Sequence, residues 1–341
     1  MTISSRSLLC LAAGLLGAAG MLLQGRRQQA LAGKIVLLTG GSRGLGLQLA
    51  RVLAREKCRL ILVARDQQRL ERTAAELRAS GAEVSVIACD LSDEVALEHM
   101  IDRALAIYGE INIIINNAGR IVVGPIDSFE KSEYRASMDL MFWAPVRITL
   151  KLLPHLLHHG NSDIVNIASI GGRISVPHML PYSCAKFALV GFSHGADSEL
   201  RPRGIHVLTV TPGLMRTGSH KHALFTGDAE KEYQWFSLGA TVPGVAMNVN
   251  RAAEQIVNAL KHRRHSLTIT WSAQLASRFH GAFPETACAA VGLAQHLLPA
   301  PNAGKKQKKG YELEAQEPAL IGALTALGEV AAERQAELPI V

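Results

Sequence analysis

Cysteine is scarce in this chain, and the few cysteines present are too scattered to organise a fold. The sequence contains five of them in 341 residues, with no C-x-x-C pair: Cys10, Cys58, Cys89, Cys184 and Cys288. An odd, widely spaced set excludes a disulfide framework or a zinc knuckle and favours a reducing compartment. The 30 glycines follow no triplet period, which excludes collagen, and no internal repeat is present.

Charge of one sign does not dominate either. The chain has 36 Lys and Arg residues against 29 Asp and Glu, a formal net charge of +7, and 48% of its residues are hydrophobic. This composition excludes wholesale disorder. The basic excess lies largely in short runs without interleaved aromatic residues, at 26–27, 262–265 and 305–309. We interpret these runs as solvated linkers or a membrane-facing patch, and we expect no nucleic-acid binding.

A single long uncharged stretch precedes the rest of the chain. Residues 7–25 carry no charge and would span roughly 28 Å as a helix, close to the hydrocarbon thickness of a bilayer. We predict an uncleaved membrane anchor, with a cleaved signal peptide as the alternative. Arg26, Arg27 and Lys34 outnumber the positive charges before the stretch, so the following domain is expected in the cytoplasm.

After this stretch, short apolar runs alternate with segments of helical periodicity. Strands are predicted at 34–39, 59–64, 83–88, 111–115, 163–168 and 205–210. Helices are predicted at 45–57, 67–80, 93–108, 131–157 and 182–199. Nearly continuous apolar strands joined by helices indicate a parallel sheet covered on both faces. We therefore predict a single doubly wound, Rossmann-like α/β domain.

The first turn of this domain is rich in glycine. The sequence TGGSRGLG, at residues 39–46, joins the first predicted strand to the first helix. Glycine allows a pyrophosphate to approach the backbone, and the helix N-terminus supplies free N–H groups. The turn therefore predicts a dinucleotide site whose candidate residues are Gly40, Ser42, Arg43, Gly44, Leu45 and Gly46.

The end of the second strand bears on the choice of cofactor. An NAD site usually has an acidic residue there to hold the ribose 2′-hydroxyl, whereas this strand ends in Ala64 and Arg65. Arg43 adds a second guanidinium nearby, and guanidinium groups bind phosphate oxygens in charge-assisted pairs. Asp66 is a rival acid but comes late. We predict NADP(H).

Further motifs follow in order along the chain: CDLSD at 89–93, NNAG at 116–119, Ser169, Tyr182-Ser-Cys-Ala-Lys186, and Pro212-Gly213 followed by Thr217. Together with the glycine turn, this set resembles the classical short-chain dehydrogenase/reductase (SDR) family, clearly over residues 33–220. The resemblance implies an NADP(H)-dependent oxidoreductase that transfers a hydride between nicotinamide and a carbonyl or secondary alcohol.

Three residues are the predicted catalytic set. Tyr182 and Lys186 are four positions apart and share a helix face. The lysine ammonium, together with the positive nicotinamide ring, is expected to lower the tyrosine pKa from its usual value of about 10. The resemblance implies that Tyr182 is the acid–base residue, that Lys186 also binds the nicotinamide ribose, and that Ser169 positions the substrate oxygen.

The resemblance also implies cofactor-binding roles for residues outside the glycine turn. Asp90 and Leu91 are expected beside the adenine, and the turn Asn117, Ala118 and Gly119 is expected to lie against the cofactor. The residues expected at the nicotinamide carboxamide are Pro212, Gly213 and Thr217. Purely structural roles for Asn116 and Gly119, and a strand-bridging role for Asn117, stay open as alternatives.

The chain departs from the family at one position. Many members have a catalytic asparagine where this sequence has Met141. The role implied for that asparagine runs largely through its main-chain carbonyl, and Pro145, four residues on, cannot donate to this oxygen. We expect a slowed or altered proton relay and an active protein.

Two groups of residues receive structural interpretations. His155, His158 and His159 have helical spacing, but no carboxylate or cysteine completes a metal site, so no metal is predicted. His178 and Cys184, near the catalytic tyrosine, are interpreted as a loop residue and a packing residue.

The segment 218–249 is expected to form a substrate lid. Its bulky residues either line a lipophilic pocket or pack on the sheet: Phe225, Tyr233, Trp235, Phe236 and Leu238. Beyond it, 272–298 is amphipathic or weakly hydrophobic with an interruption at Pro284, 299–310 is a basic linker, and 312–337 has the spacing of a final helix. The role of this tail stays open.

These features divide the chain into an N-terminal hydrophobic segment (1–32), an NADP(H)-binding catalytic domain (33–261) and a C-terminal helical extension (262–341). The predicted substrate is a lipophilic ketone or alcohol such as a lipid, sterol or 3-keto compound. The predicted location is a membrane, with the catalytic domain in the cytoplasm and homo-oligomers possible. The alternative function is a non-catalytic NADP(H)-binding or redox-sensing module.

Overall fold

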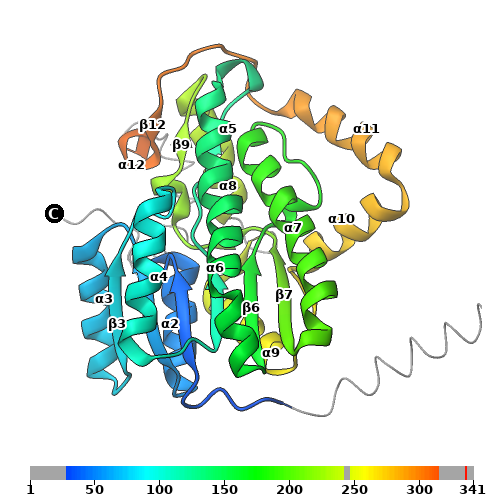
Figure 1. Cartoon of the computed structure of the whole chain (residues 1–341). Helices are drawn as coiled ribbons and strands as arrows, with labels where there is room; N and C mark the ends of the chain where they lie inside the picture. Colours follow the sequence, from blue (N-terminus) through cyan, green and yellow to red (C-terminus); the bar gives the residue numbers. More distant parts are fainter. Residues whose placement is uncertain (1–27, 242–245, 315–334, 336–341) are drawn as a thin grey trace, which may run out of the picture.

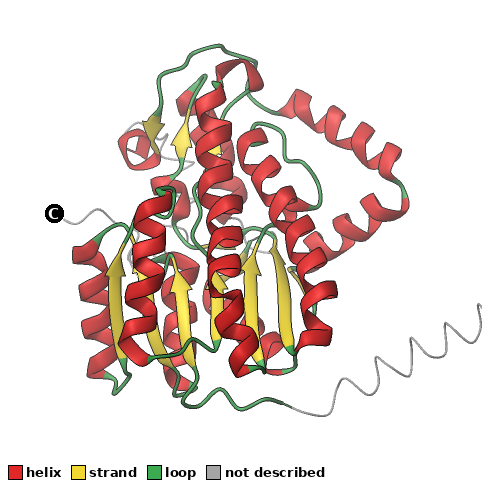
Figure 2. Ribbon diagram, in the orientation of Figure 1, coloured by secondary structure: helices red, strands yellow, loops and turns green. Residues whose placement is uncertain are grey.

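The computed structural model describes residues 28–241, 246–314 and 335. The anchor predicted at 7–25 and most of the helix predicted at 312–337 lie outside these residues. Figure 1 shows the elements in sequence colours, and Figure 2 shows a layer of strands with helices in front of it and behind it.

The centre of the described chain is a seven-stranded sheet in which every neighbouring pair is parallel. Its strands in spatial order are β11 (Ser266–Ile269), β7 (Ile205–Pro212), β6 (Ser162–Ile167), β4 (Ile113–Asn116), β1 (Ile35–Thr39), β2 (Arg59–Ala64) and β3 (Val84–Ala88). The strand order reverses between β1 and β4, and such a switch point opens a crevice at the carboxyl ends of the strands. The predicted doubly wound fold is confirmed.

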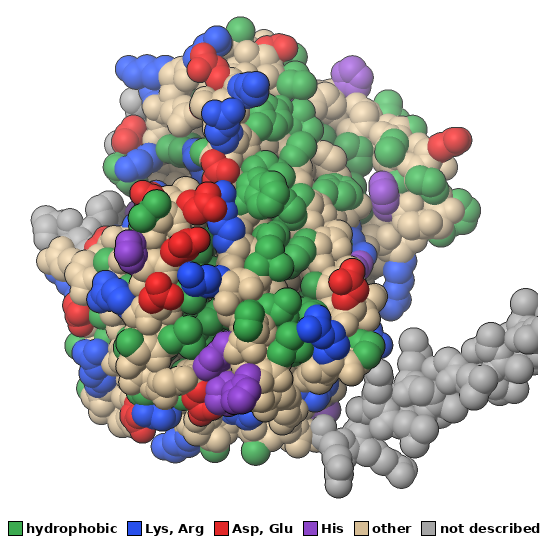
Figure 3. Space-filling model, viewed as in Figure 1, with side chains coloured by type: hydrophobic (Ala, Val, Ile, Leu, Met, Phe, Trp, Pro, Cys, Tyr) green, Lys and Arg blue, Asp and Glu red, His purple; other side chains and the backbone are tan. Residues whose placement is uncertain are grey.

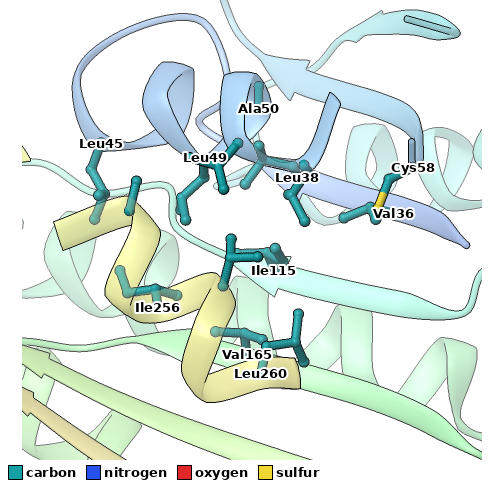
Figure 4. Packing of buried hydrophobic residues seen from close by; sticks show 14 of the residues in the cluster. Val36, Leu38, Leu45, Leu49, Ala50, Cys58, Ile115, Val165, Ile256 and Leu260 are labelled. Carbon is teal, nitrogen blue, oxygen red and sulfur yellow. The ribbon is translucent and has the colours of Figure 1, made fainter. Parts of the chain in front are cut away.

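Helices cover both faces of this sheet, which is why its strands are apolar along nearly their whole length. One face carries α2 (Gly44–Arg55), α3 (Gln67–Ala79) and α9 (Val249–Lys261), and the other carries α4 (Glu94–Tyr108), α6 (Ala144–His159) and α7 (Leu180–Leu200). Figure 4 shows Leu49 of α2 and Ile256 of α9 packed over Leu38 and Ile115 of the sheet. This packing holds the N-terminus of α2 rigidly above the crevice.

The long helix predicted at 131–157 consists of three segments. These are α5 (Lys131–Met138), a π-helical stretch at Asp139–Trp143, and α6. Within the described residues, this combined segment, Lys131–His159, is the one helix long and apolar enough to cross a membrane, with a mean hydropathy of 1.2. Half of the most apolar part of this segment is buried inside the molecule, as in a helix of a protein core.

Further short strands and helices lie outside the central sheet, both before and after α9 in the chain. The remaining helices are α8 (Ala229–Thr241), α10 (Trp271–Ala282), α11 (Pro284–Ala294) and α12 (Gly310–Leu313). The short strands are β5 (Val122–Val123), β8 (Met215–Arg216), β9 (Leu224–Phe225), β10 (Met247–Asn248) and β12 (Lys308–Lys309). Pro284 begins α11, so the predicted interruption of the helical segment at this residue is confirmed.

The basic run at 305–309 differs from its interpretation as a solvated linker. Its last two residues form β12, which pairs antiparallel with β9 in a three-stranded sheet, β12–β9–β5. Backbone pairing and ion pairs hold the run against the domain: Lys305 Nζ lies 2.9 Å from Glu130 and Lys308 Nζ lies 3.4 Å from Glu230. The sequence showed no strand here because the pairing partner lies more than 80 residues earlier.

Large apolar side chains are exposed in two places. Figure 3 shows hydrophobic side chains along the middle of the face in view, over α6 and α7. Leu150 of α6, Phe187 of α7 and the neighbouring Trp143 are exposed. The projecting pair α10 and α11, at the right of Figure 1, exposes a second set, which consists of Trp271, Leu275, Phe279, Phe283 and Leu293. Exposed apolar patches of this kind mark surfaces that meet another apolar phase.

Candidate active site

A cavity of about 880 Å³ lies at the carboxyl ends of the central strands. The structure brings the predicted residues together on its wall with one exception. The residues it places there are Gly40, Ser42, Arg43, Gly44, Leu45, Gly46, Arg65, Leu91, Asn117, Ala118, Gly119, Ser169, Tyr182, Lys186, Pro212, Gly213 and Thr217.

Asp90 is the exception, because it does not lie on the cavity wall. Its side chain is exposed and accepts a hydrogen bond from the Ser92 N–H at 3.0 Å, while its backbone carbonyl accepts one from the Asp93 N–H at 3.1 Å. The residue therefore shapes the turn after β3. Leu91, which follows it, faces the cavity.

The glycine turn is braced by the turn after β4. Asn117 Nδ2 donates to the carbonyls of Thr39 at 3.0 Å and Gly40 at 3.1 Å, which gives Asn117 the strand-bridging geometry considered above. A Cβ atom on Gly46 would overlap the Gly40 carbonyl oxygen, so only glycine allows this close approach. At the start of α2, the Gly44 N–H donates to the backbone carbonyl of Gln335 at 2.9 Å, which brings the C-terminal tail to the same turn.

The outer part of the cavity is strongly cationic. Arg43 and Arg65 line it as predicted, and Arg69 and Arg120 line it as well. Burial lowers the pKa of Arg120, Glu133 raises it, and the nearby Arg65 lowers it. Arg69 and Arg120 were missed because neither belongs to a recognised motif position, although Arg120 directly follows NNAG.

Asp66 is the one carboxylate among the described residues of this wall, and it is already engaged. Its side chain caps α3 by accepting from the Arg69 N–H at 2.9 Å, and it lies 3.6 Å from Arg69 Nε. A ribose 2′-hydroxyl would therefore meet a carboxylate that already accepts a hydrogen bond from the Arg69 N–H and lies close to the Arg69 guanidinium. The donor set suits a ligand with several phosphate oxygens, so the residues present fit NADP(H).

The predicted catalytic residues converge from two elements. Ser169 follows β6, and its Oγ accepts from the Gly171 N–H at 3.0 Å. Tyr182 and Lys186 occupy successive turns at the start of α7, with Lys186 Nζ 5.8 Å from the centre of the Tyr182 ring. Lys186 Nζ donates to the Ile167 carbonyl at 2.8 Å, which ties the helix to the end of β6.

The protonation of these groups is dominated by burial. Burial raises the pKa of Tyr182, and a hydrogen bond with Ser169 acts in the opposite direction. Burial lowers the pKa of Lys186 to about 8. Burial therefore acts against the lowering of the tyrosine pKa that is expected from Lys186 together with the positive nicotinamide ring.

Met141 takes the place that the family resemblance gives to asparagine. It is buried in the π-helical stretch between α5 and α6, next to Gly119, whose added Cβ would lie 3.5 Å from the Met141 sulfur. Asn116 has a structural role: its Nδ2 donates to Asn166 Oδ1 at 2.8 Å, and Asn166 Nδ2 donates to Ser193 Oγ at 3.1 Å. The altered proton relay stays a prediction.

The aromatic residues of the lid do not line the cavity, so of the two alternatives the structure shows packing at these positions. Phe225, Tyr233 and Phe236 are buried in a separate hydrophobic cluster with Met179 and Leu313. They fill the space between α8 and the small sheet, which is the packing alternative. The apolar wall is made instead by Ile121, Ala136, Leu140, Met215, Ala223 and Leu224.

A buried histidine–glutamate pair connects the loop before α7 to α8. His178 Nδ1 is 2.7 Å from Glu232 Oε1, and both side chains are almost fully buried. Trp235 Nε1 donates to the same carboxylate at 2.6 Å, and Gln295 Nε2 lies 2.7 Å from His178 Nε2. The loop before α7 is thus tied to α8 and to the tail, and His178 itself does not line the cavity.

The histidines interpreted structurally remain outside the site. His155 Nε2 accepts from the Ile111 N–H at 3.2 Å, and burial lowers its pKa. Over the described ranges, no three His, Cys, Asp or Glu side chains gather in a way that would hold a metal ion.

Comparison with known proteins places this geometry among enzymes. The family model described as short chain dehydrogenase matches residues 34–225, more than half of the chain. The chain is 30% identical over 244 residues to a dehydrogenase/reductase SDR family protein 7-like of Drosophila melanogaster, covering 70% of this chain and 73% of the relative. It is 33% identical over 187 residues to a fatty acyl-CoA reductase of Acinetobacter baylyi, covering 54% of this chain and 63% of the relative.

Solved structures show the same fold. An actinorhodin polyketide ketoreductase with NADPH is 27% identical, with a TM-score of 0.62, covering 71% of this chain and 97% of the other. A short chain dehydrogenase/reductase from Burkholderia phymatum in complex with NAD is 22% identical, with a TM-score of 0.68, covering 76% and 96%. At that identity the second likeness bears on the fold alone.

Proposed function

Because the chain belongs to the short-chain dehydrogenase/reductase family, we propose that it is an NADP(H)-dependent oxidoreductase acting on a lipophilic carbonyl or secondary alcohol. The observation that carries the proposal is the convergence of Ser169, Tyr182 and Lys186 on one cavity that also holds the glycine turn. These groups combine a proton donor, a donor for the substrate oxygen and a dinucleotide cradle in one place.

The protein's own groups handle the oxygen of the substrate. Tyr182 donates its phenolic proton to the carbonyl oxygen, and in the reverse direction it accepts the proton of the alcohol. Burial raises the pKa of Tyr182, which favours the proton-donating form. Ser169 Oγ donates a hydrogen bond to the same oxygen and fixes its position. Lys186, whose ammonium is held by the Ile167 carbonyl, stabilises the phenolate that forms. The nicotinamide, when bound, supplies or accepts the hydride.

The cofactor preference rests on the charge of the cavity wall. Arg43 and Arg65 would hold the 2′-phosphate, while Asp66 is occupied as the cap of α3. The Leu45 and Gly46 N–H groups at the α2 N-terminus would hold the pyrophosphate, whereas the Gly44 N–H donates to the Gln335 carbonyl. The NADPH in the ketoreductase structure supports the same choice.

The lipophilic substrate class rests on the apolar wall and on the setting of the chain. Leu140, Met215 and Leu224 line the cavity beside the catalytic groups. The uncharged stretch at 7–25 and the exposed apolar residues of α10 and α11 support a membrane-associated enzyme, where such substrates concentrate. The acyl substrate in the name of the Acinetobacter relative agrees with this class.

The test is NADPH consumption with a panel of ketones that ranges from short and polar to long-chain. The wild type should consume NADPH with the long-chain members, and Tyr182→Phe should lower kcat by about 100-fold or more while the Kd for NADPH stays unchanged. Turnover that survives Tyr182→Phe would refute the acid–base role. Cofactor binding without consumption of any ketone would instead support the non-catalytic module, the alternative suggested by Met141.

A further inference from the structure

Residues 302–314, which we call the strap, form part of the wall on the substrate side of the cavity. Strand β12 pairs with β9, with Lys308 opposite Phe225 and Lys309 opposite Leu224. The Gly227 N–H donates to the Gly304 carbonyl at 2.8 Å, and the Gly310 N–H donates to the Ala223 carbonyl at 3.1 Å. The strap lies outside the segment that the family model matches, residues 34–225.

The strap is held in a defined position. A Cβ on Gly310 would overlap the His220 carbonyl oxygen, so glycine is required for the strap to lie this close to the turn at 219–222. Leu313 is 2% exposed within the cluster around Phe225, and Lys221 Nζ lies 2.5 Å from Glu314 Oε1. A side chain on the strap is consequently presented to the cavity from a rigid support.

The two lysines of β12 point in opposite directions because side chains alternate along a strand. Lys308 reaches Glu230 on α8. Lys309 lies directly across from Leu224, and residues opposite each other in paired strands share a face. Both Lys309 and Leu224 line the cavity, which agrees with that geometry.

Among the residues that the structure describes, Lys309 differs from Lys305 and Lys308 in having no acidic partner. Lys305 and Lys308 each pair with a glutamate, whereas no carboxylate in the described part of the chain pairs with Lys309 Nζ, which lies 5.5 Å from the centre of the Tyr311 ring. The cavity's own carboxylate, Asp66, caps α3 at the end of β2. The Lys309 side chain is exposed and lines the cavity.

We propose that Lys309 binds an anionic group, a carboxylate or a phosphate, at the far end of an otherwise apolar carbonyl substrate. This inference rests on the proposed function and names the substrate class for the same site. The apolar wall around Leu224 contacts the hydrocarbon part, and the ammonium contacts the anion. Two fixed contacts set the register in which the carbonyl reaches Ser169 and Tyr182.

The experiment compares charged and neutral forms of the same ketone. The carboxylate arm uses long-chain oxo-fatty acids, with the ketone progressively further from the carboxylate, each against its methyl ester. The phosphate arm uses a long-chain 3-oxoacyl coenzyme A against the N-acetylcysteamine thioester of the same acyl chain. Each probe is assayed with the full-length wild type, Lys309→Met and the matched control Lys308→Met.

Lys309→Met should raise KM for the anionic probe of the responding arm by about 10- to 100-fold, the effect of losing one charge-assisted hydrogen bond. KM for the neutral partner, kcat for both, and the Kd for NADPH should stay unchanged, and Lys308→Met should behave as wild type. The arm that responds identifies the anion as carboxylate or phosphate.

Several results would overturn the inference. The first is a wild type whose KM is the same for acid and ester and the same for coenzyme A ester and short thioester. The second is a Lys309→Met variant that loses equally on charged and neutral probes. The third is a Lys309→Met variant whose main change is a weaker affinity for NADPH. In each of these cases the neutral ketones are still reduced and the proposed function stands. If the wild type reduces no probe, charged or neutral, the proposed function itself fails.

Discussion

The two sides of the cavity are built in different ways. On the cofactor side, the glycine turn and the turn after β4 are short segments at the ends of neighbouring strands, and Asn117 joins them through two hydrogen bonds to Thr39 and Gly40. On the substrate side, the small sheet assembles β5, β9 and β12, which lie about a hundred residues apart along the chain. The first side depends on local backbone geometry, and the second depends on long-range packing.

This difference separates the chemistry from the choice of substrate. The residues proposed to handle the oxygen and the cofactor lie at the ends of the central strands and on α7. The substrate wall includes the strap, which reaches the cavity from the C-terminal extension. Changes in the tail are therefore expected to alter stability and substrate preference while they leave the catalytic groups in place.

The largest expected effect is on the packing beneath the strap. Leu313→Ala removes a buried side chain from the cluster with Phe225 and Tyr233, and it should lower the free energy of unfolding by about 2–5 kcal/mol. Chemical denaturation measures this change. Leu297→Ala is the matched control, since Leu297 is 86% exposed in the same tail, and its replacement should have little effect. Equal effects of the two changes would show that the strap is not packed as described.

The next effect is a pH dependence of the free energy of unfolding, and it arises from a histidine on the substrate side. Burial lowers the pKa of His220 from 6.5 to about 4, with Lys221 lowering it further and Glu314 raising it. The unfolded chain therefore takes up a proton between about pH 6.5 and pH 4 that the folded chain does not. The free energy of unfolding therefore keeps its full value above about pH 6.5. It decreases by up to about 3 kcal/mol as the pH falls through this window.

His220→Phe keeps an aromatic ring beside Tyr233 but cannot take up a proton. The difference in unfolding free energy between wild type and this variant should change across the window, as followed by denaturation at a series of pH values. His296→Phe, at an exposed position of the tail, should retain the wild-type profile. A wild type and a His220→Phe variant with parallel profiles would contradict the buried, neutral histidine.

The smallest of the three effects concerns the cofactor side. Arg65→Ala removes one guanidinium from the cavity wall and should raise the Kd for NADPH about 10-fold or more, while the Kd for NADH stays unchanged. Titration of each cofactor against protein fluorescence provides the measurement. Arg72→Ala, an exposed arginine on α3, is the control. Equal losses for the two cofactors would argue against 2′-phosphate recognition.

The cofactor side was largely predictable from the sequence because its determinants are local. The turn at 39–46 needs glycine wherever the backbone approaches itself, as at Gly46, and such requirements leave a spaced pattern in the chain. Tyr182 and Lys186 lie on one helix, so their relation follows from helical periodicity. Asp90 was placed by resemblance alone, and the structure turns it toward its own loop.

The substrate side could not be predicted in the same way. The aromatic residues Tyr233, Trp235 and Phe236 had the composition of a pocket wall, but composition does not tell which face of α8 meets the cavity and which meets the core. Lys309 belonged to a basic run with the pattern of a linker, and only the pairing of β12 with β9 places it in the cavity wall. The partner of Glu232 was equally hidden, since His178 lies 54 residues earlier.

The sequence by itself determined the parallel α/β fold, the dinucleotide turn and the order of the catalytic residues, because periodicity and steric requirements act over a few neighbouring residues. The tertiary structure alone decided what lines the substrate side of the cavity and which of the described charges are paired with one another. Those properties arise from contacts between segments that are distant in the chain. The free energy of such contacts depends on how the whole chain packs, so no short sequence pattern predicts them.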